Sequence, residues 1–180
     1  MKKLLIIMSL LGVEVTTLVA GHARSRGLVI VNIGSYNDGI GQLIDGITRP
    51  GDVVVRAQGA GLSGNSVTIG STEYELFYIP VGILHDDVKC YLAGGMLIDP
   101  ELFLNELEEL KKRGVKNIKE RLRVSTSIHL IMPYHKIIDV AAEKHKHVRA
   151  GAVLRPGVRS AAGEKRFGIG IRIADLFSKD

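Results

Sequence analysis

The chain has 180 residues, and its 46% apolar content is enough to bury one hydrophobic core, so neither a disordered protein nor an array of domains is expected. Its net charge is +5, but lysines and arginines are spread along the chain and often stand beside Glu or Asp, which is typical of an ordinary solvated surface and does not indicate a nucleic-acid-binding stripe. The single cysteine, Cys90, excludes an intrachain disulfide and a cysteine-based metal cage, and its strand-like surroundings predict a buried structural thiol.

The first 26 residues allow two interpretations. A lysine-containing start, an apolar stretch from Leu4 to Leu11 and small residues around Ala23 resemble a secretory signal with its cleavage site. Glu14 and the β-branched residues beside it favour instead an added structural element or an irregular extension. We therefore predict an N-terminal extension over 1–26 and one α/β domain over 27–180. The expected location is cytoplasmic, or exported if the signal interpretation holds.

From Gly27 onward, short apolar runs alternate with helical segments. This alternation predicts an α/β fold with a mixed, mainly parallel central sheet and flanking helices. No segment of this part is long or apolar enough to span a bilayer. The first expected elements are a strand over 28–33, a glycine-containing turn over 34–41, a short helix over 43–47, a strand over 52–56, a glycine-rich loop over 58–64, a hairpin of 66–69 with 74–79, and short strands over 88–92 and 96–98.

The helix predicted over 100–113 has the clearest signals in the chain. Asp99 is a natural N-cap, Pro100 suits the first turn, and Gly114 ends the helix. Its leucines form an apolar stripe that faces the core, and Glu106 is assigned to the polar faces with the other charged residues. A strand over 124–132, a helix over 133–144 and a last strand over 168–173 are expected to follow.

Several stretches, in the same order and spacing, resemble one family, the adenylosuccinate synthetases. The most specific is Asp52 to Gly59, which reads Asp-Val-Val-Val-Arg-Ala-Gln-Gly. The resemblance covers Gly27 to Phe177, and it also rests on Ile79 to Leu84, Gly95 to Glu101, Leu122 to His129, Pro133 to His135, Asp139 and Gly170 to Phe177.

The resemblance implies a truncated fold like that of P-loop GTPases and an ancestry in AMP synthesis, where GTP and Mg²⁺ are used to join IMP to aspartate. Phosphoryl transfer needs positive charge around the transferring group and a base that activates the nucleophile. Where the family has its catalytic Asp this chain has Asn37, which cannot accept a proton near neutral pH. Ile40 and Gln42 stand in place of two lysines, so the phosphate loop has become neutral and partly apolar.

Two further family blocks are also altered. Asn65 replaces the catalytic histidine, and Leu62 replaces an asparagine that contacts IMP. In a third block only Arg155 persists of the nucleotide-phosphate residues, and the arginine that crosses the family's dimer interface falls near Gly168 or Ile169. We therefore predict that this chain alone is not catalytic.

The remaining candidate positions have a functional and a structural interpretation. The turn at Gly39 to Gln42 is either a phosphate cradle of backbone amides or an inherited strand-to-helix turn. Asp38 is either a Mg²⁺ ligand or a helix N-cap, and His85-Asp86-Asp87 is expected to be a solvated turn. The basic residues Arg155, Arg159, Lys165, Arg166 and Arg172 either bind phosphate or an acidic partner, or form a flexible basic loop. The resemblance implies nucleotide contacts at Asn37, Asp38, Gly39, Gly41, Gln42, Gly64 and Arg155, and metal contacts at Asp38 and Gly64.

Three functions stay open. The first is a non-catalytic relative that binds a purine nucleotide, the second an active GTP-dependent ligase, alone or completed by a partner, and the third a regulatory or structural subunit that dimerises with a full-length synthetase. GTP and Mg²⁺ are implied by the resemblance alone, and the alternative is no cofactor. The expected partners are a purine nucleotide and a second copy or a related synthetase, without nucleic acid or membrane.

Overall fold

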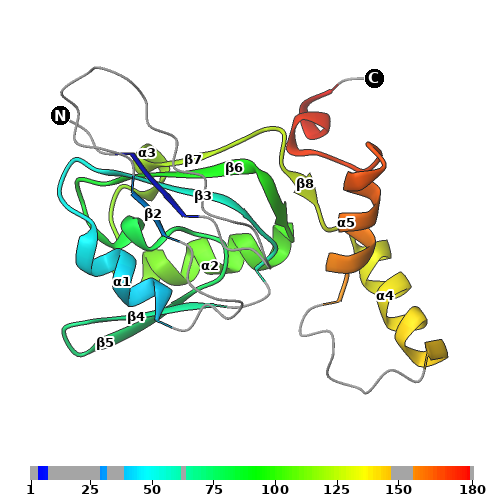
Figure 1. Ribbon diagram of the computed structural model, residues 1–180, viewed down its shortest axis with the longest axis horizontal. Coiled ribbons are helices and arrows are strands. Elements are labelled where there is room, and N and C mark those ends of the chain that lie inside the picture. The colour runs from blue at the N-terminus through cyan, green and yellow to red at the C-terminus, as the bar shows by residue number, and fades with distance from the viewer. Residues whose placement is uncertain (1–3, 8–28, 32–38, 62–63, 147–155, 179–180) are drawn as a thin grey trace.

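The computed structural model describes residues 4–7, 29–31, 39–61, 64–146 and 156–178 (Figure 1). The strands are β1 Leu4–Ile7, β2 Val29–Val31, β3 Val53–Gly59, β4 Asn65–Ile69, β5 Thr72–Leu76, β6 Lys89–Ile98, β7 Leu122–Val124 and β8 His129–Leu130. The helices are α1 Ile40–Ile47, α2 Pro100–Lys112, α3 Ile118–Arg121, α4 Pro133–Lys146 and α5 Val158–Arg166, with 3-10 turns η1 Val81–Leu84 and η2 Ile173–Phe177.

The central sheet is built from parallel pairings. Its strand order is β2-β1-β3-β6-β7, and β8 pairs with the far end of β6. Strands β4 and β5 form a separate antiparallel hairpin. The α/β class with a mainly parallel sheet is therefore confirmed, and the antiparallel pairing lies in the hairpin.

Helices α1 and α2 cover one face of this sheet (Figure 1). On that face Val54, Cys90 and Leu92 are buried, whereas alternate residues such as Val55 and Tyr91 remain partly exposed. The helices contribute Ile40, Ile44 and Leu110 to the same core. Cys90 is a buried free thiol, as predicted, and burial raises its pKa to about 12.

The local sequence signals that predicted helix α2 are confirmed. The Asp99 carboxylate accepts a hydrogen bond from the Glu101 amide at 3.1 Å, and Gly114 has a φ of +85°, which ends the helix. The hairpin is also confirmed, with Gly70 at a φ of +62° in its two-residue turn.

Three predicted strands are corrected. The runs over 88–92 and 96–98 form one strand, β6, because pairing with β3 resumes at Gly95, opposite Gln58, after a register shift. The strand expected over 124–132 is wrong, since β7 and β8 are separated by a turn. In that turn Ser125 and Ser127 are hydrogen-bonded through their hydroxyls at 2.8 Å, and the Ile128 amide donates to the Ser125 carbonyl at 3.3 Å.

The predicted helix at 133 is confirmed as α4, whereas the last predicted strand, 168–173, is wrong. This part of the chain forms the end of a turn followed by η2, with a single antiparallel bridge between His129 and Arg172. Helix α5, which the sequence interpretation missed, packs against β6 and β8 through a second apolar cluster, which consists of Ala60, Leu97, Ile131 and Ala161.

The segment assigned to an N-terminal extension contains β1, which lies in the sheet between β2 and β3. The boundary at residue 26 remains a prediction. Within the described residues, no helix has the length and apolar character needed to cross a membrane.

Candidate functional site

The strands that precede the two predicted glycine loops, β2 and β3, end at the same edge of the sheet. Val31, Ile7, Arg56 and Leu92 lie in one row across the four strands β2, β1, β3 and β6. The chain leaves this row beyond β2 and re-enters the described structure at Gly39, and three residues beyond the row β3 ends in the second glycine loop. Open parallel sheets bind ligands at the carboxyl ends of their strands, so this edge is the candidate site.

The first loop ends at the N-terminus of α1. Gly39 is the N-cap residue with a φ of 78°, and the structure shows no side-chain cap from the residues that it describes. Helix N-termini with free amides attract anions. Asn37 and Asp38, which belong to the same prediction, lie outside the described residues.

Gly41 brings the first turn of α1 against strand β4. A Cβ atom at Gly41 would lie 2.4 Å from the Ser66 carbonyl oxygen and 3.2 Å from the carbonyl carbon of Asn65. The structure therefore brings together Gly41 and Asn65, which come from two different predicted blocks. Close packing of backbone on backbone explains the glycine by itself.

Ile40 and Gln42, where the resemblance implies two lysines, have their side chains engaged by the core and by β4. Ile40 is only 2% exposed and belongs to the core. The Gln42 carboxamide accepts a hydrogen bond from the Thr68 amide at 3.0 Å and donates to the Thr68 carbonyl at 3.5 Å. Gln42 thus binds the outer edge of β4, and neither residue supplies a positive charge.

Strand β3 places two buried donors near this edge. Arg56 is 6% exposed and its Nη1 has no hydrogen-bond partner, and the same holds for Nε2 of Gln58 among the described residues. Burial lowers the pKa of Arg56, and the nearby carboxylate of Glu106 partly offsets this shift by raising the pKa. Both residues belong to the Arg-Ala-Gln-Gly run that carries the resemblance, but the sequence interpretation did not select them as site residues.

Glu106 is a further residue that the sequence interpretation misplaced, because it is 9% exposed instead of facing solvent. Its carboxylate accepts hydrogen bonds from the amides of Phe77, Tyr78 and Ile79 at 3.0, 2.9 and 3.1 Å. Burial raises the pKa of Glu106, and these amides and Arg56 act in the opposite direction. Glu106 therefore fixes the chain that follows β5 and places a negative charge near Arg56.

Comparison with known proteins decides the family. The family model for adenylosuccinate synthetase matches residues 30–180. The chain belongs to the adenylosuccinate synthetase family. It is 42% identical over 142 residues to the adenylosuccinate synthetase of Nitratidesulfovibrio vulgaris strain DP4, which covers 78% of this chain and 33% of that relative. It is 39% identical over 144 residues to that of Clostridium novyi, covering 80% of this chain and 34% of the relative.

A solved structure agrees with this assignment. The fully ligated adenylosuccinate synthetase from Plasmodium falciparum superimposes with a TM-score of 0.66 and 28% sequence identity, covering 77% of this chain and 32% of that one. The chain thus spans about a third of the length of the curated relatives it matches. Its ancestry in purine nucleotide synthesis follows from the family.

The third block that resembles the family lies at the N-terminus of α5, and Arg155 itself falls outside the described residues. Here the amides are already occupied. The Asp139 carboxylate accepts hydrogen bonds from the amides of Gly157, Arg159 and Ser160 at 2.7, 3.1 and 3.1 Å, and also from the Ser160 hydroxyl. Because Asp139 is itself an anion in this position, the α5 N-terminus does not offer a free phosphate site.

The expectation of a flexible basic loop is wrong for the described part of that cluster. Arg159, Lys165 and Arg166 belong to α5, and the Lys165 ammonium donates to the carbonyls of Gly94, Gly95 and Met96 at 3.2, 2.6 and 3.4 Å. Desolvation lowers the pKa of Lys165. This lysine ties α5 to β6 instead of presenting its charge to a ligand.

The described residues contain no group of three or more His, Cys, Asp or Glu side chains that could hold a metal ion. Asp38 lies outside the described residues, and Gly64 has no side chain; a Cβ there would lie 2.6 Å from Glu75. His85 pairs with Asp45 of α1 at 2.7 Å instead of converging with Asp86 and Asp87. Magnesium binding through Asp38 therefore remains a prediction.

Proposed function

We propose that this chain is a non-catalytic member of the adenylosuccinate synthetase family that binds a purine nucleotide at the carboxyl edge of its sheet. The observation that carries this proposal is the disposition of Ile40 and Gln42, one in the core and the other bound to Thr68. Charge that moves from GTP during phosphoryl transfer has no side-chain cation at these positions to stabilise it.

Nucleotide binding is supported by what remains at the same edge. In the described part of the chain no side chain caps the first amides of α1, and a backbone cradle can hold a phosphate without a lysine. Arg56 lies buried on β3, and its Nη1 has no hydrogen-bond partner among the residues that the structure describes. Removal of the lysines therefore weakens phosphate binding without eliminating the polar groups that attract it.

Titration calorimetry with IMP, AMP, GTP and GDP tests nucleotide binding. An assay for GTP-dependent addition of aspartate to IMP tests whether the chain is non-catalytic. We expect saturable binding of at least one nucleotide and no adenylosuccinate. Product formation by the purified chain would refute the non-catalytic part. If none of the four nucleotides binds, the binding part is wrong.

A matched pair of variants locates the binding. The Asp and Asn side chains have nearly the same shape, both tolerate the left-handed conformation of position 39, and no described atom lies within 4 Å of an added Cβ there. We expect Gly39→Asp to abolish binding because its carboxylate repels phosphate at the amides of α1, and Gly39→Asn to retain most of it. Equal affinities of the two variants would place the nucleotide elsewhere.

A second candidate function, a structural subunit that pairs with a copy of itself or with a related synthetase, is favoured by helix α4. Its exposed residues include Tyr134, Ile137 and Ile138, which are 39%, 69% and 50% exposed, whereas its His135 and Asp139 are buried. Positions 134, 137, 138 and 141 form one face of a helix, so an apolar stripe faces outward.

Multi-angle light scattering during size-exclusion chromatography tests this subunit role. We expect the chain to form a dimer with itself, or a complex with a full-length synthetase, and Ile137→Glu to dissociate it. Leu104→Glu is the control, because Leu104 is a similarly exposed aliphatic residue on α2. A monomer that also fails to bind the full-length enzyme would exclude this candidate.

A further inference from the structure

The face of the central sheet opposite α1 and α2 is open over three of its strands. Val55 of β3, Tyr91 of β6 and Arg123 of β7 are partners across neighbouring strands, so they form one row on this face. Tyr91 is 38% exposed, whereas Cys90 and Leu92 on either side of it are buried against the helices. The described residues therefore leave this row uncovered.

The row lines a cavity with a volume of about 630 Å³. Apolar side chains from β3 and β6 form its floor, and the guanidinium of β7 stands at its side. We call this surface the open sheet face, and it consists of Val53, Val55, Tyr91, Ala93 and Arg123.

Helix α5 already covers the carboxyl-terminal end of the same sheet face. Leu97 of β6 packs with Ala161 of α5 in the second apolar cluster, apart from the core that α1 and α2 share. Lys165 of α5 donates to the carbonyl of Gly94, which lines the cavity, at 3.2 Å. Parallel sheets are normally covered by helices on both faces. The open sheet face is therefore a position for a further helix beside α5.

Arg123 gives this surface a positive charge that no described carboxylate compensates. Its Nη1 donates to the carbonyls of Lys119 and Leu122 at 2.9 and 3.2 Å, which are neutral acceptors. Lys89 is the partner of Val53, lies on the same face and is exposed. Within the described ranges, neither Arg123 nor Lys89 forms an ion pair, and the residues that line the cavity include no acidic side chain.

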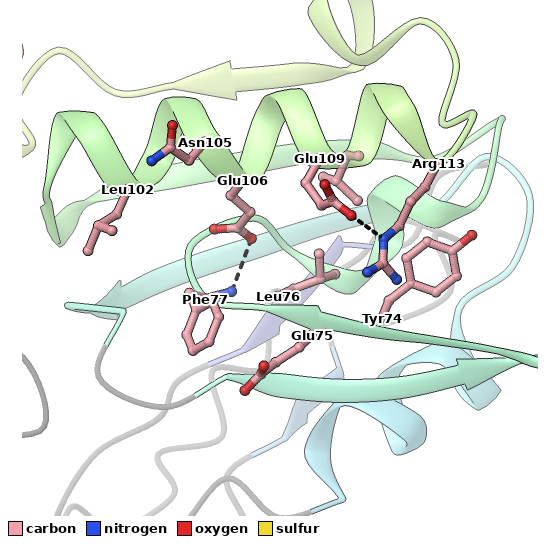
Figure 2. Close-up of a pocket in the computed structure, with 10 residues that line it drawn as sticks. Tyr74, Glu75, Leu76, Phe77, Leu102, Asn105, Glu106, Glu109 and Arg113 are labelled. Atoms are coloured by element: carbon pink, nitrogen blue, oxygen red, sulfur yellow. Dashed lines mark hydrogen bonds and ion pairs between the residues drawn. The ribbon is translucent and has the colours of Figure 1, made fainter.

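The side of the sheet that the helices cover is different. On α2 the Glu109 carboxylate pairs with Arg113 at 2.8 Å, and Glu106 accepts a hydrogen bond from the Phe77 amide at 3.0 Å (Figure 2). These charged groups have partners within the chain. The open sheet face instead combines an apolar floor with unpaired cations among the described residues, which is complementary to an apolar stripe bordered by carboxylates.

We propose that the open sheet face binds an amphipathic helix of another protein. The apolar stripe of this helix lies on Val55 and Tyr91, and its acidic residues pair with Arg123 and Lys89. An anion without apolar groups meets the cations but leaves the floor in water, so the apolar stripe is part of what is recognised. This surface lies on the face opposite α1, whose N-terminus belongs to the proposed nucleotide site.

Fluorescence anisotropy with the full 180-residue chain and the labelled peptide acetyl-SELEQLLQELEQLLQELE-amide tests the proposal. In a helix the leucines of this peptide form one stripe, which glutamates border on both sides. The comparison peptide has lysine in place of every glutamate. We expect saturable binding of the acidic peptide that weakens with added salt and is about tenfold or more tighter than binding of the basic one. No saturable binding, or equal affinity for the two peptides, would overturn the proposal.

A first pair of protein variants tests the charge. Arg123→Glu should weaken binding of the acidic peptide by about tenfold and strengthen binding of the basic one. Lys112→Glu makes the same charge change at an exposed position of α2 and should alter either affinity by about twofold at most. If the two variants behave alike, the peptide binds another surface. Nucleotide titrations of Arg123→Glu should match the parent chain, so this test stands apart from that of the nucleotide site.

A second pair tests the apolar floor. Tyr91→Asp should abolish binding of the acidic peptide, whereas Leu43→Asp, on α1 and with the same exposed fraction of 38%, should not. Circular dichroism checks that both variants fold, and the exposed Arg123 keeps the first pair informative if Tyr91→Asp does not. A dimer of the parent chain that Tyr91→Asp dissociates, without peptide binding, would assign the face to a second copy and contradict the proposal.

Discussion

Glu106 differs from Glu108 and Glu109 in its surroundings and not in its residue type. It lies four residues from Leu102 and four from Leu110, which places it on the apolar stripe of α2. The sequence therefore carried a signal that we assigned to the wrong face. Only the structure shows why Glu106 is buried: its carboxylate accepts hydrogen bonds from three amides that lie 27 to 29 residues away along the chain.

Glu106→Gln should destabilise the fold by about 2 to 4 kcal/mol, because the amide group has one acceptor oxygen and a donor that faces other donors, and because Arg56 loses its nearby anion. Urea denaturation monitored by circular dichroism measures this change. Glu109→Gln is the control, since its carboxylate is exposed and pairs only with Arg113, and it should cause a much smaller change. Equal effects of the two variants would contradict the buried role of Glu106.

Helices α4 and α5 are joined by polar side-chain contacts. The His135 ring accepts from the Met132 amide through Nδ1 at 2.8 Å, so its proton is on Nε2, which lies 2.9 Å from Glu164. The Tyr134 hydroxyl donates to the same carboxylate at 2.9 Å, and Asp139 caps α5. These contacts explain why α4 buries polar residues and leaves Ile137 and Ile138 exposed.

The contact between His135 and Glu164 should weaken in acid. The His135 hydrogen bond, followed by that of Tyr134, lowers the pKa of Glu164 below its usual value of 4.5. A carboxyl with a depressed pKa contributes stability above its unfolded-state pKa, and this contribution is lost as the pH falls through the folded-state pKa. The difference in urea midpoint between the parent chain and Glu164→Gln should therefore shrink between pH 7 and pH 3. A difference that is constant with pH would show that the Glu164 charge has no role.

At the scale of the whole molecule, the sheet joins parts of the chain that are far apart in sequence. Strand β1 pairs with both β2 and β3, and α5 is bound to β6 through Lys165. The N-terminal segment thus contributes a strand to the interior of the sheet, although its sequence also resembles a secretory signal. Removal of that segment would separate β2 from β3.

Deletion of residues 1–26 should therefore lower the urea midpoint and broaden the transition, because β3 loses a neighbouring strand. Deletion of residues 1–3, which leaves β1 intact, is the control. An unchanged midpoint after the longer deletion would instead support the interpretation of this segment as a removable signal. Circular dichroism during denaturation distinguishes the two results.

The sequence by itself determined the family, the α/β class, helix α2, the hairpin and the buried Cys90, because these features depend on local signals or on motifs that are contiguous in the chain. The resemblance also led us to predict that Ile40, Gln42 and Asn65 replace functional residues of the family. The nucleotide and metal positions that it predicted stay predictions: Asn37, Asp38, Gly39, Gly41, Gln42, Gly64 and Arg155.

Only the tertiary structure decided the features that depend on distant partners. Helix α5 begins where Asp139 of another helix caps it, and β7 and β8 are separate because each pairs with a different part of β6. Gln42 is bound by a strand 26 residues away, and the chain of β5 and the residues after it is held by Arg113 and Glu106 of α2. Such contacts are set by the packing of whole elements, since hydrogen bonds between distant segments form only when the core brings them together.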